Sequence, residues 1–310
     1  MINIEPINQI KLLGLNRYIL ELINLFKEDK LPNKILLSGS KGLGKSTLAY
    51  HFINYSLSKN EEFSYDEKNF KIDINNQTFK TIQNNSNPNF TLIDIQPDKK
   101  LIDINQIRNL ILNLNKSSFN KKPRFVLIDN IEFLNINSIN ALLKILEEPT
   151  DNVHFILINS NKKILSTLSS RCINFKIFLS HNECLEVSKK LLNNELYNLI
   201  NDDLRNYYLT PGNIYRLVKF AQNYKYDLVN INLKEFLKLI IKENHYKKNI
   251  HIKYLFFDLV EYYFRKINLS ITTNIHDKYS YFLKKISDTR KFNLDEESLF
   301  MEFEEEILNG

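Results

Sequence analysis

The sequence contains very few cysteines, which limits both disulfide bonds and soft metal sites. Of 310 residues only Cys172 and Cys184 are cysteines, too few for a disulfide framework in a chain of this length. His181 lies near them in the sequence, but three loosely spaced candidate ligands are a weak signal for a metal site. Two buried thiols and a surface imidazole are the interpretation we favour.

Long apolar runs and a leader-like N-terminus are also absent. No run approaches the roughly 20 apolar residues that cross a bilayer, and residues 1–6 lack the basic and then apolar pattern of a secretory signal. We therefore expect a cytoplasmic protein with no membrane partner. The net charge is +6, from 42 Lys and Arg against 36 Asp and Glu. This balance is compatible with a nucleic acid nearby but does not demonstrate one.

Glycine is scarce, yet three of the six glycines lie close together in a stretch that fits the phosphate-loop pattern G-x-x-x-x-G-K-S. Glycines let successive backbone N–H groups turn inward as an anion nest. Lys45 would bring charge to the outer phosphates, and the Ser46 hydroxyl is placed to bind Mg²⁺. An apolar run precedes the stretch and a helical pattern follows it, as the motif requires. The sequence predicts ATP or ADP with Mg²⁺, bound by Gly39, Ser40, Lys41, Gly42, Leu43, Gly44, Lys45, Ser46 and Thr47.

Apolar runs that alternate with helical spacing predict an α/β fold with a parallel, doubly wound sheet and ligands at the carboxyl ends of its strands. Residues 58–88 are polar and predict an insertion or a long surface loop. Beyond residue 179 the pattern is helical, with one helix expected over 185–199 and another from Pro211 to Val218. The expected strands cover residues 34–38, 90–95, 125–129, 153–158 and 173–178, and the expected domains cover 1–178, 179–223 and 224–310.

A carboxylate, Asp129, ends the third apolar run. Next to a phosphate loop such a residue holds Mg²⁺ through water, although a carboxylate can also simply end a strand. In ATPases of this kind the following residue is usually Glu, which orients the attacking water. Here it is Asn130, whose amide cannot take a proton. Glu132 lies two residues further on in a different register, and we do not expect it to replace the missing base.

A third pattern combines Ser170-Arg171-Cys172 with the stretch from Asn140 to Pro149. Together with the phosphate loop and Leu127-Ile128-Asp129, it resembles the AAA+ clamp-loader family, most of all the delta-prime subunits of bacterial DNA polymerase III. The likeness is strongest over residues 12–178. It implies an AAA+ nucleotide-binding domain over 1–178, a small helical lid over 179–223, and a helical collar over 224–310 that holds a pentameric ring.

The resemblance also implies partners and residue roles. The partners would be the other clamp-loader subunits (delta and gamma/tau) and, through the complex, the sliding clamp and primer–template DNA. Arg171 matches the arginine finger that acts on the nucleotide of a neighbouring subunit, where such a finger contributes about 10³–10⁵ in rate. Candidate nucleotide sensors are Asn159, Ser160 and Arg216.

Three departures from the family pattern set the functional expectation. Asn130 replaces the usual Glu, and the lid arginine expected three residues after Gly212 is Tyr215, with Arg216 one place on. Residues 58–88 contain no cysteine, so we expect no zinc module. We expect a subunit that binds nucleotide, hydrolyses little of it and donates Arg171. The alternatives are an active AAA+ motor subunit of the gamma/tau kind or a related DNA-processing protein. A phosphate-loop kinase of small molecules is a third possibility, which would leave the Ser-Arg-Cys motif unexplained.

Overall fold

The computed structural model describes two compact units, residues 1–187 and 188–310. The description covers residues 4–96, 99–116, 120–147, 152–193, 195–248, 250–268, 274–292 and 294–309. Glu148 and Pro149, which belong to a motif named above, lie outside it. In the part of the chain so described, no helix is long and apolar enough to cross a membrane.

The first unit is built on a five-stranded sheet in the order β2-β3-β4-β1-β5, in which every pairing is parallel. Because all strands run the same way, their carboxyl ends meet at one edge, which is where parallel α/β sheets place their ligands. This confirms the α/β sheet expected from the sequence. The strands are β1 (Lys34–Ser38), β2 (Phe90–Ile93), β3 (Arg124–Ile128), β4 (Val153–Asn159) and β5 (Ile173–Lys176).

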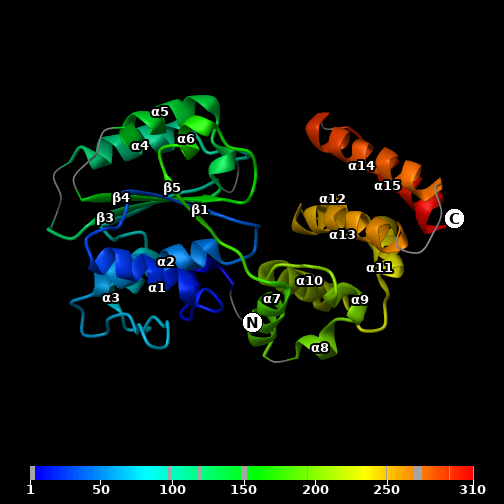
Figure 1. Ribbon diagram of the computed structural model, residues 1–310, viewed down its shortest axis with the longest axis horizontal. Coiled ribbons are helices and arrows are strands. Elements are labelled where there is room, and N and C mark those ends of the chain that lie inside the picture. Colours follow the sequence, from blue (N-terminus) through cyan, green and yellow to red (C-terminus); the bar gives the residue numbers. More distant parts are fainter. Residues whose placement is uncertain are drawn as a thin grey trace. The chain divides into compact units, whose positions relative to one another are not determined.

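Helices cover both faces of this sheet (Figure 1). One face carries α1, α2 and α3, and the other carries α4, α5 and α6. On the second face, Leu110 of α4 and Leu142 of α5 pack with Ile128 and Leu157 of the sheet in one buried cluster. These helices are α1 (Asn16–Lys27), α2 (Lys45–Ser58), α3 (Gln77–Gln83), α4 (Ile104–Leu114), α5 (Ile136–Glu147) and α6 (Ser166–Ser169), with short turns η1 (Pro6–Asn8) and η2 (Ile131–Phe133). The boundary between the two units falls within α7 (His181–Leu191).

Helix α2 is buried on all sides, in part by the segment that follows it, residues 58–88. Every residue of α2 from Leu48 to Ser58 is buried. Residues 58–88 are not simply a surface loop, because they contain α3 and bury Tyr65, Ile72 and Phe79. Their polar composition concealed these widely spaced apolar residues, which pack only through tertiary contacts.

The second unit is entirely helical in its described residues. Its elements are α8 (Leu196–Leu199), α9 (Asp202–Arg205), α10 (Pro211–Tyr224), α11 (Leu233–Lys242), α12 (His245–Lys248), α13 (Ile250–Asn268), α14 (Asn274–Phe292), α15 (Glu296–Phe303) and the π-turn η3 (Glu304–Leu308). The single helix predicted over 185–199 is wrong: α7 ends at Leu191, Asn193 adopts a left-handed φ of 53°, and α8 follows. The split of this region into a lid and a collar stays a prediction.

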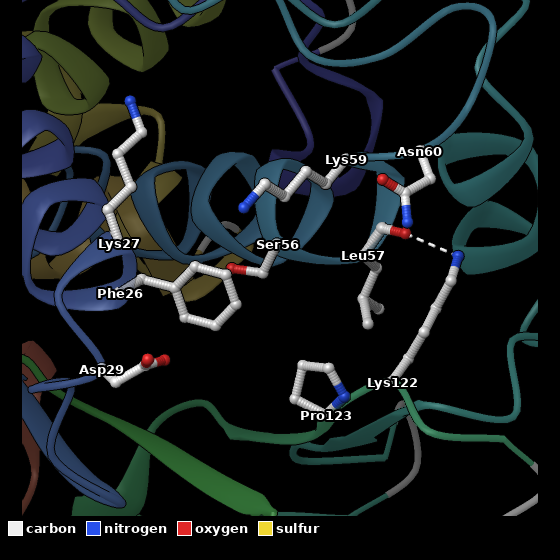
Figure 2. Close-up of a pocket in the computed structure, with 9 residues that line it drawn as sticks. All are labelled: Phe26, Lys27, Asp29, Ser56, Leu57, Lys59, Asn60, Lys122 and Pro123. Atoms are coloured by element: carbon white, nitrogen blue, oxygen red, sulfur yellow. Dashed lines mark hydrogen bonds between the residues drawn. The ribbon is translucent and has the colours of Figure 1, made fainter.

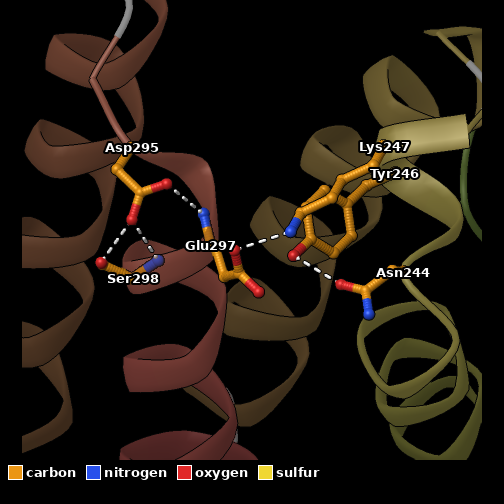
Figure 3. A network of polar contacts seen from close by, with 6 residues as sticks. All are labelled: Asn244, Tyr246, Lys247, Asp295, Glu297 and Ser298. Atoms are coloured by element: carbon orange, nitrogen blue, oxygen red, sulfur yellow. Dashed lines mark hydrogen bonds and ion pairs between the residues drawn. The ribbon is translucent and has the colours of Figure 1, made fainter.

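The acidic end of the chain is joined to lysines of preceding helices. Asp295 caps α15 by accepting from Glu297 N and Ser298 N, at 3.2 and 3.1 Å, and Glu297 pairs with Lys247 at 2.6 Å (Figure 3). Further along, Glu302 pairs with Lys285 of α14. These contacts join α15 to α12 and α14, so its carboxylates form ion pairs within the second unit.

Candidate functional site

The phosphate loop joins the carboxyl end of β1 to the N-terminus of α2. Gly39, Gly42 and Gly44 have φ angles of 152°, 89° and 88°, a region that side chains disfavour. At Gly39 a Cβ would also lie 2.4 Å from the carbonyl oxygen of Ile177. Glycine is therefore required at Gly39 both by conformation and by space, and the loop closes tightly against the chain after β5.

Lys45 lies inside its own loop. Its side chain is only 4% exposed, and Nζ donates to the carbonyl oxygens of Gly39 at 2.8 Å and Ser40 at 2.9 Å. Burial lowers the pKa of Lys45 to about 8, although attraction to Asp129 partly opposes the shift. The ammonium group is thus already at the place where phosphate oxygens would be received.

Ser46 and Asp129 lie together although they are far apart in sequence. Ser46 Oγ donates to Asp129 Oδ2 at 2.5 Å. Burial raises the pKa of Asp129, with a further increase from Asp94, while the Ser46 hydrogen bond opposes the change. One hydroxyl and one carboxylate fit Mg²⁺, a hard cation that takes oxygen ligands and usually keeps waters and substrate phosphates in its shell.

Asp94, which lies at the same sheet edge, is a site residue that was not predicted from the sequence. β2 pairs with β3 so that Ile93 lies opposite Ile128, and the next residues are Asp94 and Asp129. Asn130 donates from Nδ2 to Asp94 Oδ1 at 2.8 Å. The signal was present, because Asp94 follows an apolar strand just as Asp129 does.

The sensor candidates Asn159 and Ser160 lie at the end of β4, where Asn159 is opposite Ser38. Asn159 donates from Nδ2 to Lys162 O at 2.9 Å, while its buried Oδ1 has no hydrogen-bond partner in the described structure. Ser160 N donates to Glu132 Oε2 at 3.4 Å. Glu132 is therefore directed to this neighbouring loop.

Arg171 lies just after α6, on the same unit. Its Nη1 donates to Thr167 O at 2.8 Å, and its Nη2 pairs with Glu147 at the end of α5. About a third of the side chain is exposed to solvent. The guanidinium is thus held at the surface, away from the interior of its own domain.

Tyr215 and Arg216 belong to the second unit, on α10. Tyr215 is buried. Arg216 is half-buried, and burial lowers its pKa. None of the ion pairs formed among the described residues involves Arg216.

Cysteine chemistry has no visible role here. Burial raises the pKa of Cys172 to about 11, and Cys184 is buried. Across the described residues, no three His, Cys, Asp or Glu side chains are grouped as a metal site. The expected lack of a zinc module remains a prediction.

A hollow of about 340 Å³ lies away from the phosphate loop, beside the ends of α1 and α2 and the start of β3 (Figure 2). Lys122 reaches across to donate to Leu57 O at 2.7 Å, and Lys27 pairs with Glu67 at 2.6 Å. Because β3 begins at Arg124, this hollow is at the amino ends of the strands. It therefore takes no part in the candidate phosphate site.

Comparison with known proteins gives relatives among the subunits of DNA polymerase III. The gamma/tau subunit of Mycoplasma genitalium is 32% identical over 172 residues, 55% of this chain and 27% of that protein. The delta' subunit of Bacillus subtilis is 28% identical over 152 residues, 49% of this chain and 44% of that protein. The delta' subunit of Pseudomonas aeruginosa is 27% identical over 139 residues, 44% and 40% of the two chains. The chain thus spans less than half the length of each of these relatives.

Solved structures with a similar course of the chain include a DNA polymerase III gamma subunit-related protein of Thermotoga maritima, 17% identical, with a TM-score of 0.47 over 90% of this chain and 96% of that one. The family assignment does not depend on this likeness, since the score is low. Residues 14–179 match the family model described as DNA polymerase III, delta subunit, which is more than half of the 310 residues. This match confirms the resemblance seen in the sequence, and the chain belongs to the DNA polymerase III delta subunit family.

Proposed function

We propose that this chain is a delta-prime-like subunit of the DNA polymerase III clamp loader and acts in the cytoplasm. It would assemble with delta and gamma/tau subunits and support ATP-dependent loading of the sliding clamp onto primer–template DNA. Its family membership and the delta' relatives support this role. The partners and the DNA are proposals for this chain, since it spans only part of those relatives.

Within that complex the chain binds ATP or ADP with Mg²⁺ and hydrolyses it negligibly. The observation that carries this proposal is the contrast between two neighbouring residues. Ser46 donates a hydrogen bond to Asp129, and the two would hold Mg²⁺, whereas Asn130 stands where the resemblance expects the base, and its amide donates to Asp94. The bound Mg²⁺ would neutralise phosphate charge, Lys45 would contact the outer phosphates, and no group at position 130 would remove a proton from water.

The second candidate is an active motor subunit of the gamma/tau kind. The 32% identity with the Mycoplasma genitalium gamma/tau subunit favours it. Asn130 and Tyr215 argue against it, because each replaces a residue that the resemblance expects in an active subunit.

Nucleotide titration and ATP turnover of the purified chain distinguish the two. We expect the wild type to bind ADP in the presence of Mg²⁺, Lys45→Ala to lose that binding, and both to show turnover at background level. Robust turnover by the wild type that Lys45→Ala abolishes would establish the motor. Purification of a tagged copy, with identification of co-purifying subunits, tests the proposed partners independently.

A further inference from the structure

The side chain at position 130 is held by a carboxylate that directly follows the neighbouring strand, β2. The parallel pairing of Ile93 with Ile128 brings the ends of β2 and β3 together, and Asn130 Nδ2 donates to Asp94 Oδ1 at 2.8 Å. The same oxygen accepts from Ile95 N at 2.7 Å. The carboxylate is therefore fixed by its own backbone, and it in turn fixes the orientation of the amide.

This contact has a definite polarity. An ionised carboxylate only accepts hydrogen bonds, so its partner must donate, and an amide NH₂ does. Asp, which has the same shape as Asn, would place two acceptor oxygens about 2.8 Å apart at this contact, next to a third carboxylate, Asp129. Like charges this close together repel one another. The electrostatics of the sheet edge thus favour a neutral residue at 130 as long as Asp94 is present.

The backbone acts in the same direction. Asn130 has a φ of 56°, in the left-handed region that Asn and Asp adopt more readily than other side chains. Glu at this position would be strained in addition to being repelled. Asn130 is neutral and also adopts the left-handed conformation readily. Its amide oxygen can accept a hydrogen bond from water without removing a proton.

We propose that Asp94 is a positioning residue. Its carboxylate accepts a hydrogen bond from the neutral side chain at position 130 and would repel a carboxylate there, and it thereby excludes the base that ATP hydrolysis needs. This inference rests on the proposed nucleotide-binding function. The coupling between Asp94 and Asn130 can be measured without any nucleotide, so an experiment can contradict this inference and leave the proposed function intact, or the reverse.

The first test is a thermal-unfolding cycle at pH 7.5 on the full chain, comparing wild type, Asp94→Asn, Asn130→Asp and the double variant. Asn130→Asp should lower Tm by about 5 °C, because it opposes two carboxylates. The double variant exchanges donor and acceptor, keeps the hydrogen bond, and should recover most of that loss.

Asn85→Asp is the matched control, since Asn85 is exposed and has a similar left-handed φ of 52°. It should leave Tm unchanged. The proposal would be overturned if the Tm decrease of the Asp94→Asn/Asn130→Asp double variant equalled the sum of the decreases of the two single variants. It would also be overturned if Asn130→Asp lowered Tm no more than Asn85→Asp does. Binding of Mg²⁺ and ADP by the wild type is measured alongside, and its absence would overturn only the proposed function.

The second test measures ATP turnover. Asn130→Glu alone should remain at background, whereas Asp94→Asn/Asn130→Glu should exceed it by about tenfold. This gain is smaller than the factor of about 10²–10⁴ that a placed general base typically contributes, because the strained backbone at position 130 and Tyr215 remain. Equal turnover above background in these two variants would mean that Asp94 does not restrict position 130.

Discussion

At the scale of single residues, Lys45 is the group whose state must change when nucleotide binds. It is buried and bonded to two carbonyl oxygens of its own loop. Carbonyl oxygens stabilise an ammonium less than phosphate oxygens do, because they carry only partial charge. A phosphate that enters the loop therefore competes with these carbonyl oxygens for the Lys45 ammonium group. In the free protein the pKa of this group is already lowered to about 8.

We expect ADP affinity to fall as pH rises above about 8. Phosphates favour the charged form of Lys45, so binding takes up a proton wherever the free protein has lost it, and affinity falls by up to about tenfold per pH unit. Titrations from pH 7 to 9.5 measure the effect. Lys45→Met should bind weakly at every pH, and a wild-type affinity that stays constant across this range would contradict the account.

Without nucleotide, Lys45 also makes the folding stability depend on pH. The stability rises with pH, whereas the ADP affinity falls. Its folded pKa of about 8 lies below the ordinary value of 10.5, so the unfolded chain binds more protons between these values. Its contribution to the free energy of unfolding therefore becomes more favourable as pH rises through that window. Lys45→Met removes this contribution and serves as the control.

The sequence predicted part of the site at this scale and could not predict the rest. The loop and Asp129 follow from motifs whose chemistry is local, and the structure brings Ser46 and Asp129 together. Asp94 is visible in the sequence as a carboxylate after an apolar run, but its contact with Asn130 depends on which strands are neighbours, and the order β2-β3-β4-β1-β5 is not written in any short pattern. The hydrogen bond that explains Asn130 was therefore beyond reach of the sequence.

At the scale of elements, α2 is held by a buried polar network on the side away from the sheet. Asn54 of α2 donates from Nδ2 to Asn76 Oδ1 at 2.8 Å. The same oxygen accepts from Phe79 N at 2.7 Å, which caps α3, and Asn76 Nδ2 donates to Phe63 O at 2.6 Å. One fully buried amide thus fixes the start of α3, the preceding loop and α2 together.

We expect Asn76→Ala to lower the free energy of unfolding by about 2–4 kcal/mol, because it removes a helix cap and leaves buried polar partners unsatisfied. Denaturant unfolding measures the change. Asn75→Ala is the matched control, since Asn75 is its exposed neighbour, and it should change stability by less than about 0.5 kcal/mol. A similar small loss in Asn76→Ala would show that residues 58–88 are not coupled to the fold of the first unit.

This network also shows why the surface-loop alternative for residues 58–88 was wrong. Asparagines are common in this sequence, and in a pattern of hydrophobic periodicity they count as loop residues. Asn76 is one of them, yet it is buried because its amide is fully used. Strand positions were predicted well, as for residues 34–38, because their apolar runs identify them without tertiary information.

At the scale of the whole molecule, the proposed role of Arg171 concerns a nucleotide that this chain does not hold. Its guanidinium lies at the surface, bonded to Thr167 O and paired with Glu147. Arg cannot lose its proton at neutral pH, and its planar group of donors suits a γ-phosphate. Two of its nitrogens are oriented by these contacts, so the group is partly arranged before any neighbouring subunit arrives.

We expect Arg171→Ala to lower the DNA-stimulated ATPase of a reconstituted clamp loader while leaving this chain folded and able to bind ADP. Exposed ion pairs contribute about 0–1 kcal/mol to stability, whereas an arginine finger contributes about 10³–10⁵ in rate at the one site it serves. Arg171→Lys should be nearly as damaging, because an ammonium cannot reproduce the bidentate geometry. Lys80→Ala, at an exposed lysine of α3, controls for loss of one positive charge. Turnover is compared in complexes whose assembly is verified by gel filtration, and wild-type turnover in an assembled Arg171→Ala complex would leave the Ser-Arg-Cys motif with a structural role only.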